Sequence, residues 1–288
     1  MKYKLRSRNN EEIITTESNK TLNFFYDNIL GRLLLFLLVN KLTSNIVAVY
    51  MNSKLSKFKI KKYINNKKIN MDDYTVTKYN SFNDFFTRKI IDDRRPIDMN
   101  INSFISPCDS KLSVYSINPD LTLKIKDSYY VINTLVDKDI LNEYIDGYAL
   151  VFRLDVDDYH RYCYIDSGSK ENNVKIKGIY HTVQPISLKH YNFYKTNSRE
   201  YTVLNTNNFD KVIQVEIGAM CIGRINNYHE KYHFTKGEEK GRFEFGGSTI
   251  VLLVKKDTIK IDEDILKNSA MDVETIVKYG EKIGNKIN

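Results

Sequence analysis

The stretch Lys236–Val254, which reads KGEEKGRFEFGGSTIVLLV, decides the fold that we expect for this chain. Aromatic, β-branched and apolar residues flank its centre, Gly246-Gly247-Ser248-Thr249, as in a buried strand. Glycine within a strand removes side-chain packing and marks a bulge or a close approach of the backbone. Taken alone, the four residues are most simply interpreted as a bulged turn. The same geometry would hold the hydroxyl of Ser248 near the carbonyl of Gly247, where it could attack.

Short runs typical of strands recur after Phe104, separated by turns that contain Gly, Asn or Lys. This spacing predicts an antiparallel core, barrel-like or sandwich-like, rather than a sheet of alternating strands and helices. One further segment, Val131–Tyr144, is predicted to be a helix. The expected fold class is therefore α+β, with N-terminal helices followed by a β-rich catalytic core. The strands predicted most clearly are Ala149–Asp155, Val174–Val183, Lys211–Ile225 and Arg242–Val254.

The N-terminal part of the chain, 1–70, is predicted to be a helical region separate from a catalytic domain at 71–288. Its apolar run Leu33–Val39 is far shorter than the roughly 20 residues that span a bilayer, so we expect no spanning helix. Lysines at 54, 57, 59, 61 and 62 follow the apolar segment. An apolar helix with a basic tail suits an interfacial membrane anchor, and a core helix packed on the catalytic domain is an equal alternative.

A short helix is predicted at Ser81–Ile91, with Ser81 as N-cap and Asp84 at the third helical position. Arg88 lies on this helix and is a candidate ligand for a phosphate head group. A solvated arginine at the surface is the simpler interpretation.

Composition limits the function classes without choosing one. Among 288 residues, 44 Lys+Arg against 36 Asp+Glu give a net charge of +8, which suits either anionic lipid or nucleic acid. The three cysteines are widely spaced, so neither a disulfide framework nor a zinc cluster is indicated, and an intracellular setting fits best. The first 18 residues lack the apolar core of a signal peptide.

Five segments in order resemble the phosphatidylserine decarboxylase family. One is the opening stretch, and the others are SFNDFFTRKIIDDRRPID at 81–98, SPCDSKL at 106–112, DDYHRYCYIDSG at 157–168 and EIGAMCIGRI at 216–225. In that family a Gly-Ser-Thr step within a strand becomes a pyruvoyl cofactor. The resemblance implies self-cleavage between Gly247 and Ser248 into a large chain, 1–247, and a small chain, 248–288, which stay together as a heterodimer.

The resemblance also implies an activity and a catalytic triad. The pyruvoyl group derived from Ser248 would form a Schiff base with phosphatidylserine and release CO2 and phosphatidylethanolamine, without a metal or pyridoxal phosphate. The family's Asp, His and Ser match Asp109, His160 and Ser248. Histidine is the side chain best able to exchange a proton near neutral pH, and a carboxylate partner would fix its tautomer. We expect His160 to be the base for Ser248, oriented by Asp109.

One position departs from the family's pattern. Many members carry a second histidine three residues after the first, and this chain has Cys163 there. We expect His160 alone to suffice. His181 lies in a segment that resembles a strand lining the family's site, which makes it a candidate for substrate binding, although a half-buried strand histidine without a role is simpler. His229 and His233 have the spacing of metal ligands but no third ligand, so no metal site is expected.

The expected location is the cytoplasmic side of the cell membrane, as a peripheral protein that meets phosphatidylserine in the bilayer. A homo-oligomer is left open, and no nucleic-acid partner is expected. Two alternatives remain at this point. A related pyruvoyl enzyme could decarboxylate a soluble amino acid, and a non-enzymatic basic β-module would bind nucleic acid without being cut.

Overall fold

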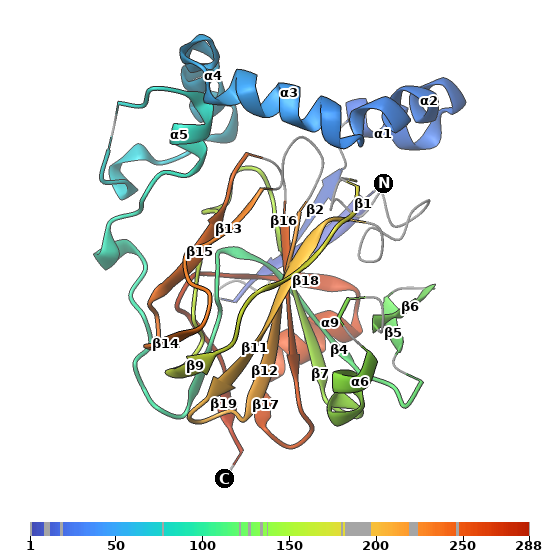
Figure 1. Cartoon of the computed structure of the whole chain (residues 1–288), viewed down its shortest axis with the longest axis vertical. Coiled ribbons are helices and arrows are strands. Elements are labelled where there is room, and N and C mark those ends of the chain that lie inside the picture. The colour runs from blue at the N-terminus through green and yellow to red at the C-terminus, as the bar shows by residue number, and fades with distance from the viewer. Residues whose placement is uncertain are drawn as a thin grey trace.

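A layer of helices lies over one end of a β-rich body in the computed structural model (Figure 1). The structure describes residues 2–8, 12–17, 20–76, 78–120, 122–125, 128–132, 135–136, 138–179, 181, 197–218, 224–245 and 248–287. The predicted fold class, α+β with a β-rich core after N-terminal helices, is confirmed. A β hairpin, β1 (Lys2–Ser7) and β2 (Ile13–Glu17), precedes the helices and joins the body.

The helical layer is broken into short segments because polar residues interrupt its apolar runs. Asn28 ends the first helix and caps the second, since its side chain accepts hydrogen bonds from the amides of Leu30 and Gly31. The segments are α1 (Lys20–Asp27), α2 (Ile29–Leu38), α3 (Lys41–Asn52), the 3-10 turn Lys54–Phe58, α4 (Lys59–Lys67) and α5 (Phe82–Phe86). Short 3-10 turns follow at Met71–Asp73 and Asp92–Arg94.

No single helix among the described residues has both the length and the apolar composition to cross a bilayer. The pair Ile29–Leu38 and Thr43–Asn52 meets that test only when taken together, and it is bent by 67°.

The β-rich body is built on an eleven-stranded sheet, counted over the described residues. Its order is β14-β9-β11-β12-β16-β7-β4-β18-β1-β2, with β10 paired to β11. All of its ladders are antiparallel except the one between β1 and β18. The strands not yet given bounds are β4 (Ser110–Ser116), β7 (Tyr148–Leu154), β9 (Gly168–Lys170), β10 (Val174–Ile176), β11 (Arg199–Thr206), β12 (Lys211–Ile217), β14 (Tyr232–Phe234), β16 (Ser248–Val254) and β18 (Val273–Val277).

Smaller sheets and two helices complete the body. One sheet joins β13 (Ile225–Asn227), β15 (Glu239–Phe243) and β8 (Arg161–Cys163), and another joins β17 (Ile259–Ile261), β19 (Lys282–Lys286) and β3 (Ser103–Ile105). A separate hairpin consists of β5 (Thr122–Ile125) and β6 (Ser128–Val131). The helices are α6 (Lys138–Leu141), continued by a 3-10 turn at Asn142–Tyr144, and α9 (Glu263–Ala270).

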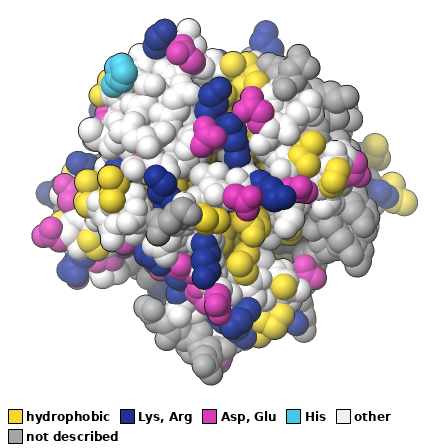
Figure 2. All heavy atoms as spheres, turned by 90° about the horizontal axis from the view of Figure 1, so that it is seen from below, with side chains coloured by type: hydrophobic (Ala, Val, Ile, Leu, Met, Phe, Trp, Pro, Cys, Tyr) yellow, Lys and Arg dark blue, Asp and Glu magenta, His cyan; other side chains and the backbone are white. Residues whose placement is uncertain are grey.

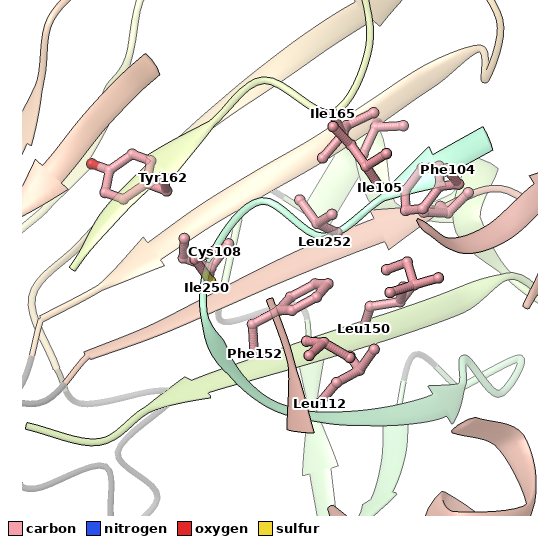
Figure 3. Packing of buried hydrophobic residues seen from close by; sticks show 14 of the residues in the cluster. Phe104, Ile105, Cys108, Leu112, Leu150, Phe152, Tyr162, Ile165, Ile250 and Leu252 are labelled. Carbon is pink, nitrogen blue, oxygen red and sulfur yellow. The ribbon is translucent and has the colours of Figure 1, made fainter. Parts of the chain in front are cut away.

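Alternate residues of the central strands face two different cores. One core contains Leu150, Phe152, Ile250 and Leu252 together with side chains from β3 and β8, as Figure 3 shows. Residues of the opposite parity, such as Val151 and Val251, pack in the other core against the region of α6. Because β16 is buried on both faces and paired on both edges, its residues Ile250–Val254 form an unbroken apolar run in the sequence.

Several predicted boundaries were wrong. The predicted helix Val131–Tyr144 is not one helix, since Val131 ends β6 and helical structure begins only at Lys138. The helix predicted at Ser81–Ile91 ends at Phe86, although Ser81 does cap it by accepting a hydrogen bond from the amide of Asp84.

Two predicted strands are also shorter than expected. The run Lys236–Val254 contains two strands, β15 and β16, which belong to different sheets. The predicted strand Lys211–Ile225 ends at Ile217, and residues 219–223 lie outside the described residues. The predicted strand Val174–Val183 ends at Ile176, and residues 180 and 182–196 lie outside the described residues.

Candidate active site

The three predicted catalytic residues converge at one end of three neighbouring strands. Ser248 is the first residue of β16 and pairs with Leu154, the last residue of β7. Asp109 directly precedes β4, which lies on the other side of β7, and His160 closes the turn between β7 and β8. Helix α5 packs over this end, where the ring of Phe86 contacts both His160 and Phe245. The fold therefore brings together segments that are far apart in sequence.

His160 is buried in the neutral form. The centre of its ring lies 4.1 Å from that of Phe86, and its side chain is fully buried. Its Nδ1 atom lies 2.9 Å from the carbonyl oxygen of Asp158. Because a carbonyl only accepts hydrogen bonds, Nδ1 carries the proton and Nε2 carries the lone pair. Burial lowers the pKa of His160 to about 3.

Both reacting atoms of the predicted pair lack a partner. The Nε2 atom of His160 and the Oγ atom of Ser248 are buried, and neither has a hydrogen bond within the described part of the chain. Buried polar atoms are nearly always satisfied, so an unsatisfied one calls for an explanation. A lone pair on the histidine and a hydroxyl on the serine are the two groups that a proton transfer requires. Gly246 and Gly247 lie outside the described residues, so the carbonyl at the predicted cleavage site is not placed.

Asp109 does not contact His160 in the way that we expected. Its carboxylate accepts hydrogen bonds from Nε and Nη2 of Arg95, at 2.8 and 2.6 Å, and from the amide of Tyr279 at 2.8 Å. Burial would raise the pKa of Asp109, but Arg95 and Lys278 outweigh burial and hold it below its ordinary value. The carboxylate is therefore ionised and held by an arginine, because the fork of a guanidinium matches both of its oxygens. Its catalytic role remains a prediction.

Asp158 supplies the partner that we assigned to Asp109. Its backbone carbonyl fixes the tautomer of His160. Its carboxylate accepts hydrogen bonds from Nζ of Lys111 at 2.6 Å and from the amide of Asp155 at 2.7 Å, which holds the turn in shape. Lys111 also lies 3.3 Å from the carboxylate of Asp155, whose other oxygen is 2.5 Å from Arg153. A buried network of alternating charges thus holds the turn whose backbone carbonyl, that of Asp158, contacts His160.

His181 reaches the same end of the sheet through Asn197. The side chain of Asn197 bonds to the amide and the carbonyl of His181, at 2.9 and 2.8 Å, and to the carbonyl of Gly218 at 2.7 Å. Gly218 directly follows Ile217, which pairs with Thr249. The Nδ1 atom of His181 lies 3.2 Å from the hydroxyl of Tyr26 in α1, and burial lowers the pKa of His181 to about 4.

Arg88 is buried rather than solvated. Its guanidinium lies over the rings of Tyr74 and Phe85, 4.4 and 4.7 Å from their centres. It donates to the carbonyl oxygens of Phe85 and Asp157 and to the hydroxyl of Tyr74. Its Nε atom is buried and unbonded among the described residues. Its charge is also one of the causes of the lowered pKa of His160, although smaller than burial.

Cys163 occupies the position at which many family members have a second histidine. The side chain is fully buried, with Sγ 3.9 Å from the carbonyl oxygen of Ser106. Burial raises the pKa of Cys163 to about 12, so the thiol is neutral. A neutral, buried thiol behaves as a small apolar group here.

Sequence reasoning missed the supporting residues. Asp158 stood in the quoted segment DDYH, and its position two residues before the histidine was a usable signal. Lys111 and Arg153 gave no signal, because only the register of β4 and β7 places them opposite each other. Over the described residues, no three His, Cys, Asp or Glu side chains group closely enough to hold a metal ion.

The body thus carries, at one end, a neutral buried histidine and a buried serine hydroxyl, which are the groups of an enzyme that transfers protons. A family model described as phosphatidylserine decarboxylase matches residues 82–285. The chain belongs to the phosphatidylserine decarboxylase family, and this makes it a carboxy-lyase.

Similarity to named proteins extends beyond the span of that model. A protein of Clostridium acetobutylicum named phosphatidylserine decarboxylase proenzyme 2 is 52% identical over 268 residues, which cover 92% of each chain. A protein of Clostridium botulinum strain Langeland named phosphatidylserine decarboxylase proenzyme is 41% identical, with 99% of each chain covered. One of the same name from Clostridium tetani is 39% identical over 99% of this chain and 98% of the relative.

Proposed function

We propose that this chain is a phosphatidylserine decarboxylase proenzyme that cuts itself between Gly247 and Ser248. The observation that carries the proposal is a pair of buried atoms, Nε2 of His160 and Oγ of Ser248, which lie at one end of the sheet and have no hydrogen bond to any described residue. The names of the relatives supply the substrate, since the proteins that match nearly the whole chain are named for phosphatidylserine. Neither of these two relatives is named for a free amino acid or for nucleic acid, so neither alternative is favoured.

His160 is suited to start the self-cleavage. With its pKa lowered to about 3, the imidazole is neutral across the physiological range and can accept the proton of Ser248 Oγ through Nε2. The oxygen then adds to the carbonyl carbon of Gly247, and the acyl group moves from nitrogen to oxygen as the amide bond breaks. Removal of the α-proton of Ser248 expels the carboxylate of Gly247. Water then replaces the α-nitrogen of the dehydroalanine, which leaves as ammonia.

The residues present fit the pyruvoyl group that this reaction would leave at position 248. The site is buried, and β16 holds the new N-terminus between two neighbouring strands. A pyruvoyl group supplies an electron sink for the loss of CO2 from an amino acid head group. Arg88, with a buried Nε that lacks a partner among the described residues, would hold the anionic part of the substrate. His181, tied to Gly218 through Asn197, would face the substrate from the end of β12, beside the start of β16.

A lipid substrate requires a surface that meets a bilayer, and the helical layer provides one. Six large apolar side chains on α2 are between 46% and 73% exposed, which is unusual for a surface facing water. They are Ile29, Leu30, Leu33, Leu34, Phe36 and Leu37. Lys54, Lys57, Lys61 and Lys62, all exposed, follow in sequence and would meet anionic lipid. On the opposite end of the molecule, acidic, basic and hydrophobic side chains are interspersed (Figure 2).

The helical layer also touches the turn that carries the catalytic histidine. The hydroxyl of Tyr63 in α4 donates to the carbonyl oxygen of Val156 at 2.6 Å, and Lys67 lies 3.3 Å from Asp157. We therefore propose a peripheral protein at the cytoplasmic face of the cell membrane, in which the helices of the N-terminal region 1–70 deliver the lipid to the domain 71–288. The cut chains would remain a heterodimer of 1–247 and 248–288.

Intact mass under denaturing conditions tests the proposal. The purified protein should give two chains that divide at Gly247 and Ser248, and the smaller should react with a carbonyl reagent. Ser248→Ala should give one chain without that reactivity. The cut protein should release CO2 from phosphatidylserine in mixed micelles but not from free serine. A single chain after long incubation with lipid, or release of CO2 from free serine alone, would refute the proposal.

A further inference from the structure

A buried ion pair lies on the same face of the sheet as Ser248. The side chains of Lys240 on β15 and Glu216 on β12 are both 0% exposed, and Nζ lies 2.8 Å from Oε1. Lysine and glutamate are almost never fully buried unless they are paired. None of the catalytic steps described above uses either residue.

The register of the sheet places this pair beside the cleavage site. Glu216 pairs with Ile250, and Ser248 precedes Ile250 by two residues on the same strand. Side chains two residues apart in a strand point to the same face. Glu216 and Ser248 are therefore diagonal neighbours on one face, a relationship that puts such residues about 7–8 Å apart.

Asn227 on β13 extends the ion pair into a network. Its Oδ1 atom accepts hydrogen bonds from Nζ of Lys240 at 2.7 Å and from the hydroxyl of Tyr162 at 3.1 Å. Its Nδ2 atom donates to the carboxylates of Glu200 and Glu216, at 3.0 and 3.3 Å. All four hydrogen-bonding positions of the amide are thus filled. A fully satisfied buried network fixes the relative position of the elements that it joins.

The elements joined are those that must be aligned for cleavage. Lys240 lies on β15, which runs toward Gly246 and Gly247, and Glu216 lies on β12, which flanks β16. Tyr162 lies on β8, two residues after His160. The network therefore links three elements: β15, which precedes the Gly247–Ser248 junction, β12, which lies beside β16, and β8, which follows His160. β15 and β8 belong to a three-stranded sheet, whereas β12 and β16 belong to the eleven-stranded sheet. Neither the β15–β8 ladder nor the β12–β16 ladder joins one sheet to the other.

We propose that the Lys240–Glu216 pair, bridged by Asn227, is a positioning device that aligns the segment entering Gly247 with His160 and Ser248 during self-cleavage. This inference rests on the proposed function. Removal of one partner leaves a buried charge without compensation, which the structure relieves by moving the strand that carries it. The reacting atoms are sensitive to such a movement, because a misplacement of 1 Å costs roughly a hundredfold in rate.

The test compares self-cleavage rates of newly translated precursor at a temperature well below unfolding for every variant. Lys240→Met should slow cleavage at least about tenfold. Lys240→Met combined with Glu216→Gln, which restores neutrality, should recover the parental rate to within about threefold. Lys236→Met is the matched control. Lys236 is also buried, but its Nζ donates to the carbonyl oxygens of Asn100 and Ser103, away from the junction. We expect this control to lose stability and keep its cleavage rate.

Rescue by the double variant separates positioning from a purely structural role, because all variants are assayed well below their unfolding temperatures. If Lys240→Met fails to fold, Glu216→Gln and the double variant replace it. A parental rate in a folded single variant, or a double variant as slow as the single one, would overturn the inference. A parent that never cuts would instead refute the proposed function.

Discussion

The depressed pKa of His160 predicts a specific loss of stability in acid. The folded pKa is about 3 and the ordinary value is 6.5, because burial disfavours the charged imidazolium. Between these values the unfolded chain binds a proton that the folded chain does not. The contribution of neutral His160 to the free energy of unfolding is therefore fully present above about pH 6.5, and it is lost as the pH falls from 6.5 toward 3. Each pH unit within the window contributes up to about 1.36 kcal/mol, so lowering the pH from 6.5 to 4.5 costs about 2 kcal/mol through this residue.

The measurement is the free energy of unfolding in urea at the two pH values. Ser248→Ala keeps the chain uncut, and it is compared with the same variant that also carries His160→Gln. Other groups, including His181, titrate in both proteins and cancel in the difference. The first variant should lose about 2 kcal/mol more than the second. Equal losses in the two would show that His160 is not held neutral by burial, and the argument that it is a ready base would fail.

Three further predictions follow from single side chains. Asp109→Asn removes the charge that balances Arg95, so the uncut chain should lose about 3 kcal/mol of stability in urea, and no loss would contradict the buried pairing. Phe36→Ser changes a side chain that is 73% exposed, so binding to phosphatidylserine vesicles should fall about tenfold in a sedimentation assay while the melting temperature stays unchanged. Gly280→Ala adds a Cβ atom 2.5 Å from Cδ1 of Ile97 at a φ of +79°. This change should lower the stability of the protein by about 1–3 kcal/mol in thermal unfolding, and an unchanged melting temperature would contradict the expected strain.

The family and fold class could be predicted from the sequence because buried strands and the Gly-Ser-Thr step leave a local pattern. Within β16 the run Ile250–Val254 is apolar throughout, since both faces and both edges of the strand are covered. The N-cap at Ser81 is likewise a local property, and the structure has it. The prediction of a helix at 131–144 was wrong because an apolar pattern of that length does not distinguish the end of a strand from the start of a helix.

The partners of the candidate site could not be predicted, because they depend on register and on competition between charges. Asp109 and Asp158 are both acidic residues close to the site, and the sequence does not show which of them pairs with Arg95. The pair Lys240 and Glu216 is separated by 24 residues and meets only because two sheets pack face to face. Such contacts follow from the tertiary structure rather than from spacing along the chain.

The strand order has a consequence for how long the two cut chains stay associated. The 248–288 segment contributes β16 between β12 and β7, and β18 between β4 and β1. Its strands alternate with those of 1–247, and β19 pairs with β3, so separating the chains would require five ladders among the described residues to open at once. Exchange of small chains between molecules should therefore be as slow as global unfolding. Each mature molecule would keep for its lifetime the cofactor that it made, and an inactive precursor could not be rescued by mixing it with an active one.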